Sequence, residues 1–432
     1  MGAPVSSAKL ETARSALESA CEEVTDAGEH DAVDAVAPSM VARPASTEQV
    51  ADVMRAAAAY GLAVVPRGRG TKLSWGQPPT RVDLVVDLSR MSAVLEHAAG
   101  DLIVDTQSGA TLAEVQRIVA AEGQRLAVDE TVPGASVGGT LATATSGPGR
   151  VAVGTVRDLL IGVTVVRADG VVAKAGGRVV KNVAGYDLGK IVIGSFGTLA
   201  VITQAVFRLH PQPGARRIVT RDFDDADQAQ HLVQQILHAQ VVPAAVEVQW
   251  MSGKAGNLMV LLEGTQAGVE ARQATVMTML GEGARSSDKF PDWWGRYPWD
   301  DDEGHAGRAG PRRTAIKVTF ALSGLSQVLE SARAAAEQAR IPLNLRGSAG
   351  AGVLYGSFPA DADVGGISDV VDKLRGVCTS LGGALVVLDA PPQVKAAVDT
   401  WGPVPAIDLM RRVKDQFDPE NRLAPGRFVG GI

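Results

Sequence analysis

The stretch VVPRGRGTKLSWG, residues Val64–Gly76, decides how the rest of the chain is interpreted. It begins with two β-branched residues that favour a strand and continues into a loop in which Gly68 and Gly70 flank Arg69. Glycine lets a backbone approach a ligand closely, and successive backbone N–H groups in such a loop form a concave site for anionic oxygens. Basic side chains add positive charge around it. We therefore interpret residues Arg67–Lys72, called the cradle below, as a binding site for a diphosphate.

Two other kinds of phosphate site are not favoured by the same residues. The Rossmann fingerprint requires a third glycine that opens a helix, and Leu73 occupies that place. The sequence Gly-x-x-x-x-Gly-Lys-Ser/Thr of a P-loop does not occur in the chain. When Gly68–Gly70 is considered alone, the alternative interpretation is a plain tight turn after a strand.

Length and composition are those of an ordinary globular protein. At roughly 100–200 residues per domain, the 432 residues predict two or three domains, and a hydrophobic content of 46% suffices for their cores. The formal net charge of −6 does not favour a nucleic-acid-binding surface. No uncharged apolar run is long enough to span a membrane, and no cysteine or histidine spacing predicts a metal site. Cys21 and Cys378 are isolated, which favours a reducing, cytoplasmic location.

A second stretch is unusually rich in small residues. Val128–Pro148 has the sequence VDETVPGASVGGTLATATSGP, with four glycines among serines and threonines and almost no charge. A surface linker of this length normally carries more charge and fewer Val, Leu and Ala residues. We expect a buried segment against which a large flat ligand lies, with a plain glycine-rich loop as the alternative.

The hydrophobic pattern predicts an α/β first part and a different second part. The first part is expected to hold helices at 6–27, within 42–61 and at 111–123, and strands at 64–65, 82–88, 102–105, 160–167, 171–175 and 202–209. Pro211-Gln212-Pro213 marks a domain boundary. Beyond it the order strand, helix, strand, strand, helix occurs twice, which predicts two ferredoxin-like units. Between them lies an aromatic-rich insert, expected to be a lid, a partner contact or a poorly ordered loop, and a helix at 407–417 follows the second unit.

Four motifs follow one another along the chain. They are PRGRGTKLSWG, PGASVGGTLATATSGP, KNVAGYDL followed by GSFGTLAVIT, and the closing FDPENRLAPGR. Together they resemble the FAD-linked oxidases of the vanillyl-alcohol oxidase and p-cresol methylhydroxylase (PCMH) type. Within that family TSGPGR, VRDLLIG and KNVAGYDL are most similar to the FAD-binding E subunits of bacterial glycolate oxidases. The resemblance covers residues 42–213 and the last dozen residues, and between them only the α/β rhythm matches.

The resemblance implies a fold and a domain order. The fold class is α/β (α+β), with a two-subdomain PCMH-type FAD-binding domain followed by a ferredoxin-like α+β cap domain. The implied domains are an N-terminal helical extension at 1–40, the FAD-binding domain at 41–213, the cap at 214–405 with the insert at 286–313, and a C-terminal helix and tail at 406–432 that return to the flavin domain.

The resemblance also implies which residues bind FAD. The cradle would meet the pyrophosphate largely through backbone N–H groups, and the second stretch would lie along the flavin and its ribityl chain. The implied set is Arg67, Gly68, Arg69, Gly70, Thr71, Lys72, Pro133, Gly134, Ser136, Gly138, Gly139, Thr143, Thr145, Ser146, Gly197, Thr198 and Ile202.

Three departures from the family pattern qualify this set. Thr71-Lys72 stands where covalently flavinylated relatives carry histidine, so we expect non-covalent FAD. Phe196 stands where many members carry glutamate. The motif His-x-Gly-Asp-Gly-Asn, which lactate- and glycolate-oxidising relatives carry in the cap for metal and substrate, has no match, so neither a metal site nor a catalytic base is assigned. Arg346 is a candidate partner for a substrate carboxylate, with a surface arginine at a strand end as the alternative.

The resulting hypothesis is the FAD-binding subunit of a glycolate-oxidase-type 2-hydroxyacid dehydrogenase, an FAD-dependent oxidoreductase. The alternatives are a non-catalytic electron-transfer or scaffold subunit and a stand-alone sugar or aldonolactone oxidase. Because the chain has no cysteine cluster for an electron relay, we expect it to work in a complex. The resemblance implies a second flavoprotein subunit and an iron–sulfur subunit as partners, with at most peripheral attachment to the inner face of the plasma membrane through them.

Overall fold

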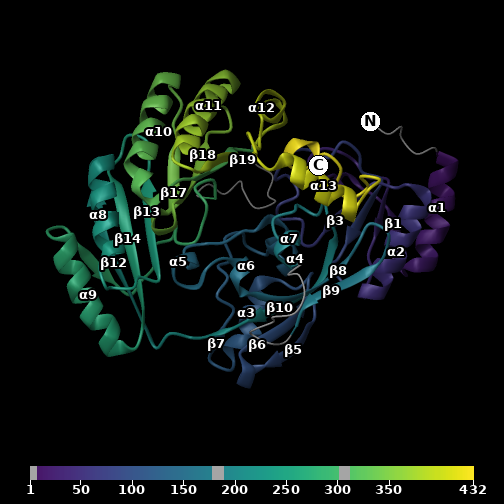
Figure 1. Cartoon of the computed structure of the whole chain (residues 1–432), viewed down its shortest axis with the longest axis horizontal. Coiled ribbons are helices and arrows are strands. Elements are labelled where there is room, and N and C mark those ends of the chain that lie inside the picture. The colour runs from purple at the N-terminus through teal and green to yellow at the C-terminus, as the bar shows by residue number, and fades with distance from the viewer. Residues whose placement is uncertain (1–6, 178–188, 301–311) are drawn as a thin grey trace. The chain divides into compact units, whose positions relative to one another are not determined.

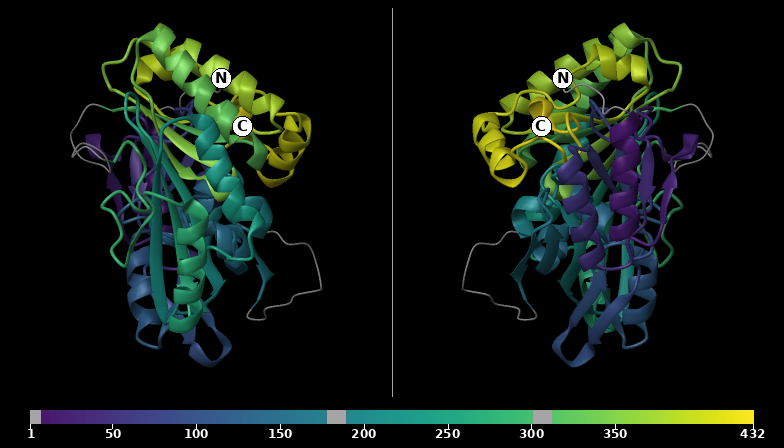
Figure 2. Two further views of the ribbon diagram at one scale, coloured as in Figure 1. Left: turned by 90° about the vertical axis from the view of Figure 1, so that its left-hand side faces the viewer. Right: turned by 90° about the vertical axis from the view of Figure 1, so that its right-hand side faces the viewer.

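The computed structural model describes residues 7–177, 189–300 and 312–432, so the KNVAGYDL motif at 181–188 lies outside the described residues. The chain divides into two compact units, and Figures 1 and 2 show their elements. The first unit comprises Met1–Thr145, Thr155–Pro211 and Pro403–Ile432, and the second comprises Ser146–Gly154 and Gln212–Gly402. The domain boundaries expected from the sequence stay predictions.

The first lobe of the first unit is built on a four-stranded sheet. Its strand order is β1-β2-β4-β3, with β2, β4 and β3 parallel to one another and β1 antiparallel at the edge. The helices α1 and α2 pack against each other beside this sheet (Figures 1 and 2). The elements are α1 (Ser7–Ala20), β1 (Val24–Asp26), β2 (Met40–Ala42), α2 (Thr47–Tyr60), β3 (Val64–Arg67) and β4 (Leu84–Asp87).

Local chemistry sets the bounds of α2. The Ser46 side chain accepts a hydrogen bond from Gln49 N at the start of the helix, and Gly61 ends it in the left-handed conformation with a φ of 66°. Val50, Met54 and Ala57 recur at helical spacing and are buried against the sheet. The first helix is shorter than expected from the sequence, because the chain after Ala20 forms β1 and pairs Thr25 with Val41.

The second lobe of the first unit is an antiparallel sheet with the order β5-β6-β10-β8-β9. The helices α3, α4 and α6 contribute Val115, Leu141 and Leu159 to its core. The elements are β5 (Val94–Ala98), β6 (Ile103–Gln107), α3 (Leu112–Ala120), β7 (Gln124–Arg125), α4 (Val137–Thr143), α6 (Val156–Leu159), β8 (Leu160–Val166), β9 (Val172–Gly176), α7 (Gly189–Val192), β10 (Val201–Arg208) and β11 (His210–Pro211). The two lobes confirm the expected two-subdomain α/β architecture.

The C-terminal segment extends the first sheet. After α13 (Ile407–Phe417), Leu423 forms a parallel bridge with Val64 of β3, and Ala424 N donates to Val64 O over 2.8 Å. The closing motif therefore lies along the strand that leads into the cradle.

The second unit is one eight-stranded antiparallel sheet with the order β15-β12-β14-β13-β17-β18-β16-β19. Each half has the strand order of a ferredoxin-like unit, which confirms the predicted fold class, and β13 pairs with β17 at the junction. One face carries the main core together with the helices. The elements are α5 (Arg150–Val153), β12 (Ala215–Phe223), α8 (Ala226–His238), β13 (Ala245–Trp250), β14 (Gly256–Gly264), α9 (Gln266–Leu280), β15 (Arg285–Ser287), β16 (Thr314–Thr319), α10 (Leu325–Ala339), β17 (Asn344–Ser348), β18 (Val353–Phe358), α11 (Val364–Ser380), β19 (Ala384–Asp389) and α12 (Pro392–Ala397).

Candidate functional site

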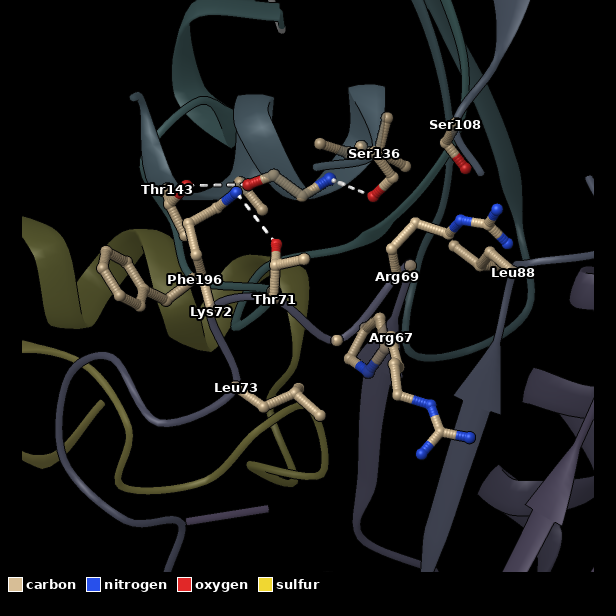
Figure 3. Close-up of a pocket in the computed structure, with 18 of the residues that line it drawn as sticks. Arg67, Arg69, Thr71, Lys72, Leu73, Leu88, Ser108, Ser136, Thr143 and Phe196 are labelled. Atoms are coloured by element: carbon tan, nitrogen blue, oxygen red, sulfur yellow. Dashed lines mark hydrogen bonds between the residues drawn. The ribbon is translucent and has the colours of Figure 1, made fainter. Parts of the chain in front are cut away.

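The cradle lines a cavity in the first unit (Figure 3). The cavity holds about 700 Å³ of empty space, part of which is open to solvent. Its walls come from both lobes, at the ends of β3, β4 and β6, along α4 and at the start of β10. The lining residues are Pro66, Arg67, Gly68, Arg69, Gly70, Thr71, Lys72, Leu73, Leu88, Ser108, Ser136, Gly138, Gly139, Ala142, Thr143, Phe196, Gly197, Ala200, Ile202 and Arg427.

The charge of Arg67 is neutralised within the fold. Its guanidinium lies 2.7 Å from Asp31 Oδ1 and 2.7 Å from Asp87 Oδ2, and all three side chains are at most one-tenth exposed. In Figure 3 the guanidinium points away from Ser136 and Thr143. Burial opposes the charged form, but the two carboxylates outweigh it and raise the pKa of Arg67. The expectation that Arg67 adds net positive charge to the cradle therefore needs correction, because this side chain instead fixes the end of β3.

Lys72 supplies a buried cation that the fold does not neutralise by contact. The residue is 7% exposed, and the hydrogen bond described for Nζ is a long one of 3.5 Å with Thr71 Oγ1. Desolvation lowers the pKa of Lys72 to about 8. The carboxylate of Glu130 opposes this lowering only in part. A desolvated ammonium in a cavity wall favours a ligand that brings negative charge.

Gly68 and Ser136 meet where the cradle crosses the start of α4. A Cβ at Gly68 would lie 2.1 Å from Ser136 Oγ, so this position has room for glycine only. Ser136 caps α4 by accepting from Gly139 N over 3.2 Å, and Thr143 Oγ1 donates to Gly139 O over 2.7 Å (Figure 3). The backbone of the cradle thus comes close to the helix that forms the opposite wall.

Ser108 lines the cavity directly after β6 and was not predicted from the sequence. It is fully buried, and its Oγ has no hydrogen-bond partner within the described residues. Its side chain also faces Gly138, where a Cβ would lie 2.8 Å from Ser108 Cβ. An unpaired buried hydroxyl is costly in a folded protein, and a polar ligand in the cavity would satisfy it.

The segment before β10 forms a further wall. Gly197 adopts a φ of +75°, and a Cβ there would lie 3.3 Å from Pro66 Cδ of β3. Phe196, the residue that departs from the family pattern, has a φ of 55° and lines the cavity. Its ring stacks on Phe428 with centroids 5.7 Å apart. At this position the chain presents an aromatic ring that packs on the C-terminal tail.

Five residues of the expected set lie elsewhere. Pro133 and Gly134 are exposed and do not line the cavity. Thr145 is buried outside the lining, and the Thr198 hydroxyl donates to Ser195 O over 2.7 Å. Ser146 belongs to the second unit. The role of the whole set toward FAD stays a prediction.

Arg427, from the closing motif, also lines the cavity. The sequence identifies this motif but assigns no contact to its arginine. Its guanidinium donates to Leu73 O over 2.7 Å and to Trp75 O over 2.8 Å. The C-terminal tail therefore holds the far end of the cradle loop in place.

Arg346 lies in β17 of the second unit, and only 4% of the residue is exposed. The alternative interpretation, a surface arginine at a strand end, is therefore wrong. Its guanidinium lies 5.2 Å from the centroid of the Trp293 ring and donates to Tyr297 O over 3.4 Å. The described part of the aromatic insert packs within this unit, since Trp299 and Tyr297 are 3% and 2% exposed. Trp293 and Trp294 are half-buried, and the expectation that the insert contacts a partner stays a prediction.

Two further observations concern metals and membranes. Within the described residues, no group of three or more histidine, cysteine, aspartate or glutamate side chains is arranged to hold a metal ion. Of the helices in residues 7–177, 189–300 and 312–432, none is both long and apolar enough to cross a membrane.

Comparison with known proteins finds FAD-binding domains and oxidoreductases among the matches. The FAD binding domain family matches residues 38–176, and the C-terminal domain of FAD linked oxidases matches residues 395–428. Glycolate oxidase subunit GlcD of Bacillus subtilis is 24% identical over 421 residues, 90% of this chain and 89% of the relative. D-lactate dehydrogenase of Archaeoglobus fulgidus is 28% identical over 412 residues, 90% of this chain and 91% of the relative. The structure of p-cresol methylhydroxylase with substrate bound superposes with a TM-score of 0.74 at 16% identity, covering 98% of this chain and 97% of that chain.

The fold, the cavity and these matches define the class of the protein, which is an FAD-linked oxidoreductase. Residues 38–176 and 395–428 match the two domains of FAD-linked oxidases, the fold is that of p-cresol methylhydroxylase, and the cofactor is FAD.

The cavity residues fit this cofactor. The cradle leaves no room for side chains at Gly68, the Lys72 ammonium suits a diphosphate, and the unpaired Ser108 hydroxyl suits a polar atom of FAD.

Proposed function

We propose that this chain is the FAD-binding subunit of a 2-hydroxyacid dehydrogenase of the glycolate oxidase type. The observation that carries the proposal is the convergence of a glycine cradle, the buried Lys72 ammonium and the unpaired Ser108 hydroxyl on one cavity. The named relatives, glycolate oxidase subunit GlcD and D-lactate dehydrogenase, support a small 2-hydroxy acid as substrate. When bound, FAD supplies the acceptor for a hydride from the α-carbon of that acid.

The residues of this chain position the cofactor. Gly68 and Gly70 let the cradle backbone approach the diphosphate, and Lys72 offsets its charge. Ser108 and the backbone of α4 line the cavity opposite the cradle, where they would hold polar atoms of FAD in place. Arg67 acts on the ligand only indirectly, since its guanidinium is paired with Asp31 and Asp87. Thr71 and Lys72 offer no histidine for a covalent link, so we propose that the FAD is held non-covalently and is released by denaturation.

The test of this function is anaerobic reduction of the purified, FAD-loaded chain. Glycolate, D-lactate and D-2-hydroxyglutarate are mixed separately with the oxidised protein, and the visible absorbance of the flavin is followed. Bleaching by one of these acids supports the proposal. Bleaching by a sugar or aldonolactone instead contradicts it in favour of a stand-alone oxidase, and a flavin that only dithionite reduces contradicts it in favour of a non-catalytic subunit.

We further propose that the chain works in a complex. The described cysteines, Cys21 and Cys378, are both buried and unlinked, and the full sequence contains no other cysteine, so an iron–sulfur relay has to come from another protein. Affinity purification from the native host is expected to recover a second flavoprotein and an iron–sulfur protein. Recovery of the chain alone, with rapid turnover of a hydroxy acid by oxygen, would contradict this part.

A further inference from the structure

The sheet of the second unit has two chemically different faces. Side chains alternate between faces along a strand, so Val246 and Leu345 join the helix-covered core while their neighbours point to the other side. On that other face, the half made by β12, β14 and the start of β13 is apolar. Its residues Ile218, Ala245, Met259 and Leu261 are covered by Phe290, Trp293 and Trp294.

The remaining half of this face is polar although it is largely buried. The pairing registers place Gln249, Arg346, Tyr355 and Lys317 in one row across β13, β17, β18 and β16, and Glu247 beside Ser348 in the next row. Directly paired residues point to the same face of a sheet, so these six side chains share it. Arg346, Tyr355, Ser348 and Glu247 are each at most 8% exposed.

Arg150 of α5 reaches the same row from a separate segment of this unit. Its Nη2 lies 3.3 Å from Tyr355 Oη and also donates to Ser146 O, while Nε donates to Gly147 O over 3.3 Å. These backbone carbonyls hold one side of the guanidinium, and no hydrogen bond is described for Nη1. The planar fork is therefore oriented by the fold, with one nitrogen available to a ligand.

The Tyr355 hydroxyl lies in a positive environment. Burial raises its pKa, but Lys317 and Arg150 together with hydrogen bonds from Arg150 and Tyr297 lower the pKa of Tyr355 below its usual range. In the two rows and α5, three cationic side chains face one carboxylate, that of Glu247. A buried region with excess positive charge is unfavourable unless an anion compensates it.

Ser348 provides an independent sign of a missing ligand. The residue is 4% exposed, and its Oγ has no hydrogen-bond partner among the described residues. A buried hydroxyl in a strand normally finds a partner. Tyr297 packs against this region, since its ring stacks on Trp299 at 4.5 Å and lies 4.6 Å from the Tyr355 ring.

We infer that the second unit carries a binding site for a small carboxylate, formed by Arg150, Tyr355 and Lys317 with the Ser348 hydroxyl beside them. The inference rests on the proposed function, because the ionised end of a 2-hydroxy acid is the carboxylate that the reaction would bring. A fork-shaped cation, an ammonium and two hydroxyls are the groups that bind a planar carboxylate. Arg346, the candidate from the sequence, lies in the same row and is held by the Trp293 ring.

The test uses the full-length, FAD-loaded, oxidised protein and oxalate, a dicarboxylate that donates no hydride. Isothermal titration calorimetry is expected to show one oxalate per chain, with inorganic phosphate failing to compete. Arg150→Gln, Tyr355→Phe and Lys317→Met should each raise the dissociation constant about tenfold or more. Arg333→Gln, an exposed position on α10, is the matched control and should leave it unchanged.

Each outcome decides the inference. Wild-type affinity in all three variants, preference for phosphate over oxalate, or no oxalate binding by the wild type would overturn it. Lys317 is partly exposed and has no described bond to lose, so Lys317→Met keeps the test valid if the Arg150 or Tyr355 variant fails to fold. Oxalate binding without flavin reduction by any hydroxy acid would support the site and contradict the proposed function. Flavin reduction by a hydroxy acid with an unchanged KM in all three variants would support the proposed function and contradict the carboxylate site.

Discussion

Lys414 Nζ lies 2.6 Å from Asp418 Oδ2, and both side chains are at most 5% exposed. The same ammonium donates to Thr198 O over 2.8 Å and to Leu423 O over 3.0 Å. Asp418 in turn accepts from Arg422 N and Leu423 N. One ion pair therefore connects α13, the loop before β10 and the tail that lies beside the cradle strand.

Replacing Asp418 by asparagine should destabilise the first unit. Burial already lowers the pKa of Lys414 although Asp418 and Asp415 oppose this, so without Asp418 the ammonium stays buried and loses the carboxylate that it contacts. We expect the free energy of unfolding to fall by about 3 kcal/mol, measured by urea denaturation. Asp415→Asn is the control, because its exposed carboxylate is the weakest of the groups that act on Lys414, and it should change stability by less than about 0.5 kcal/mol. Equal stabilities for the two variants would contradict the role assigned to this pair.

Two substitutions at Gly70 separate the effect of an added charge on FAD binding from the effect of an added side chain. Its φ is +74°, which asparagine and aspartate tolerate better than other side chains, and a Cβ would have no neighbour closer than 3.7 Å. Gly70→Asp should abolish FAD binding and leave the fold largely intact, because it brings a carboxylate close to a diphosphate. Gly70→Asn has the same shape without the charge and should bind FAD at least about tenfold more tightly than the aspartate variant. Full flavin occupancy in Gly70→Asp would mean that the diphosphate lies elsewhere.

The pKa of Lys72 predicts a pH-dependent affinity for FAD. In the FAD-free protein burial depresses this pKa to about 8, against 10.5 for an ordinary lysine, and Glu130 is the charged group that acts on it. A diphosphate beside the ammonium should restore the higher value, so binding above pH 8 takes up a proton. Between pH 7 and pH 9 the dissociation constant for FAD should rise about tenfold.

The lowered pKa of Lys72 also predicts how the stability of the FAD-free protein depends on pH. A lysine whose pKa is lower in the folded state carries a cost when charged, and this cost disappears as pH rises from about 8 toward 10.5. The FAD-free protein should therefore gain stability over this range relative to Lys72→Met, which lacks the group. Calorimetry in two buffers of different ionisation enthalpy measures the proton uptake. An identical pH profile of FAD affinity in Lys72→Met would assign the titration to another group.

The cradle could be located from the sequence because its signals are local. Glycines between basic residues at the end of a strand predict an anion-binding loop at residues 67–72, and in the structure all six line one cavity. That they bind FAD stays a prediction. What could not be predicted is the direction of the Arg67 side chain. Its partners Asp31 and Asp87 are 36 and 20 residues away, and only folding brings them together.

The helix α4 was missed for a related reason. Gly138 and Gly139 disfavour a helix, so residues 128–148 were expected only to be a buried segment. The helix forms because Ser136 caps it and because Val137 and Leu141 are fully buried in the core of the second lobe. Tertiary packing overrides the local preference here.

In the second unit the element order follows from periodicity, but the polar row does not. Strand and helix lengths predict two ferredoxin-like halves. The pairing of β13 with β17, which sets Glu247 beside Ser348, joins two strand edges that carry no sequence signal for each other. Arg150 lies nearly a hundred residues from that strand, at the end of the motif TSGPGR, and the sequence assigns this arginine no role.

Ser108 provides the sharpest test of where FAD lies, because its hydroxyl should have opposite effects with and without the ligand. The Oγ is buried and unpaired within the described residues, so Ser108→Ala removes a cost and should stabilise the FAD-free protein by about 1 kcal/mol. If FAD satisfies this hydroxyl, the same change should weaken FAD binding about fivefold. Thr140→Val is the matched control. Its hydroxyl is also buried and unpaired but does not line the cavity, so this variant should stabilise the FAD-free protein and leave FAD affinity unchanged. Thermal unfolding without FAD and titration with FAD measure the two quantities. Weaker FAD binding in Thr140→Val, or unchanged binding in Ser108→Ala, would contradict the position of FAD against the end of β6.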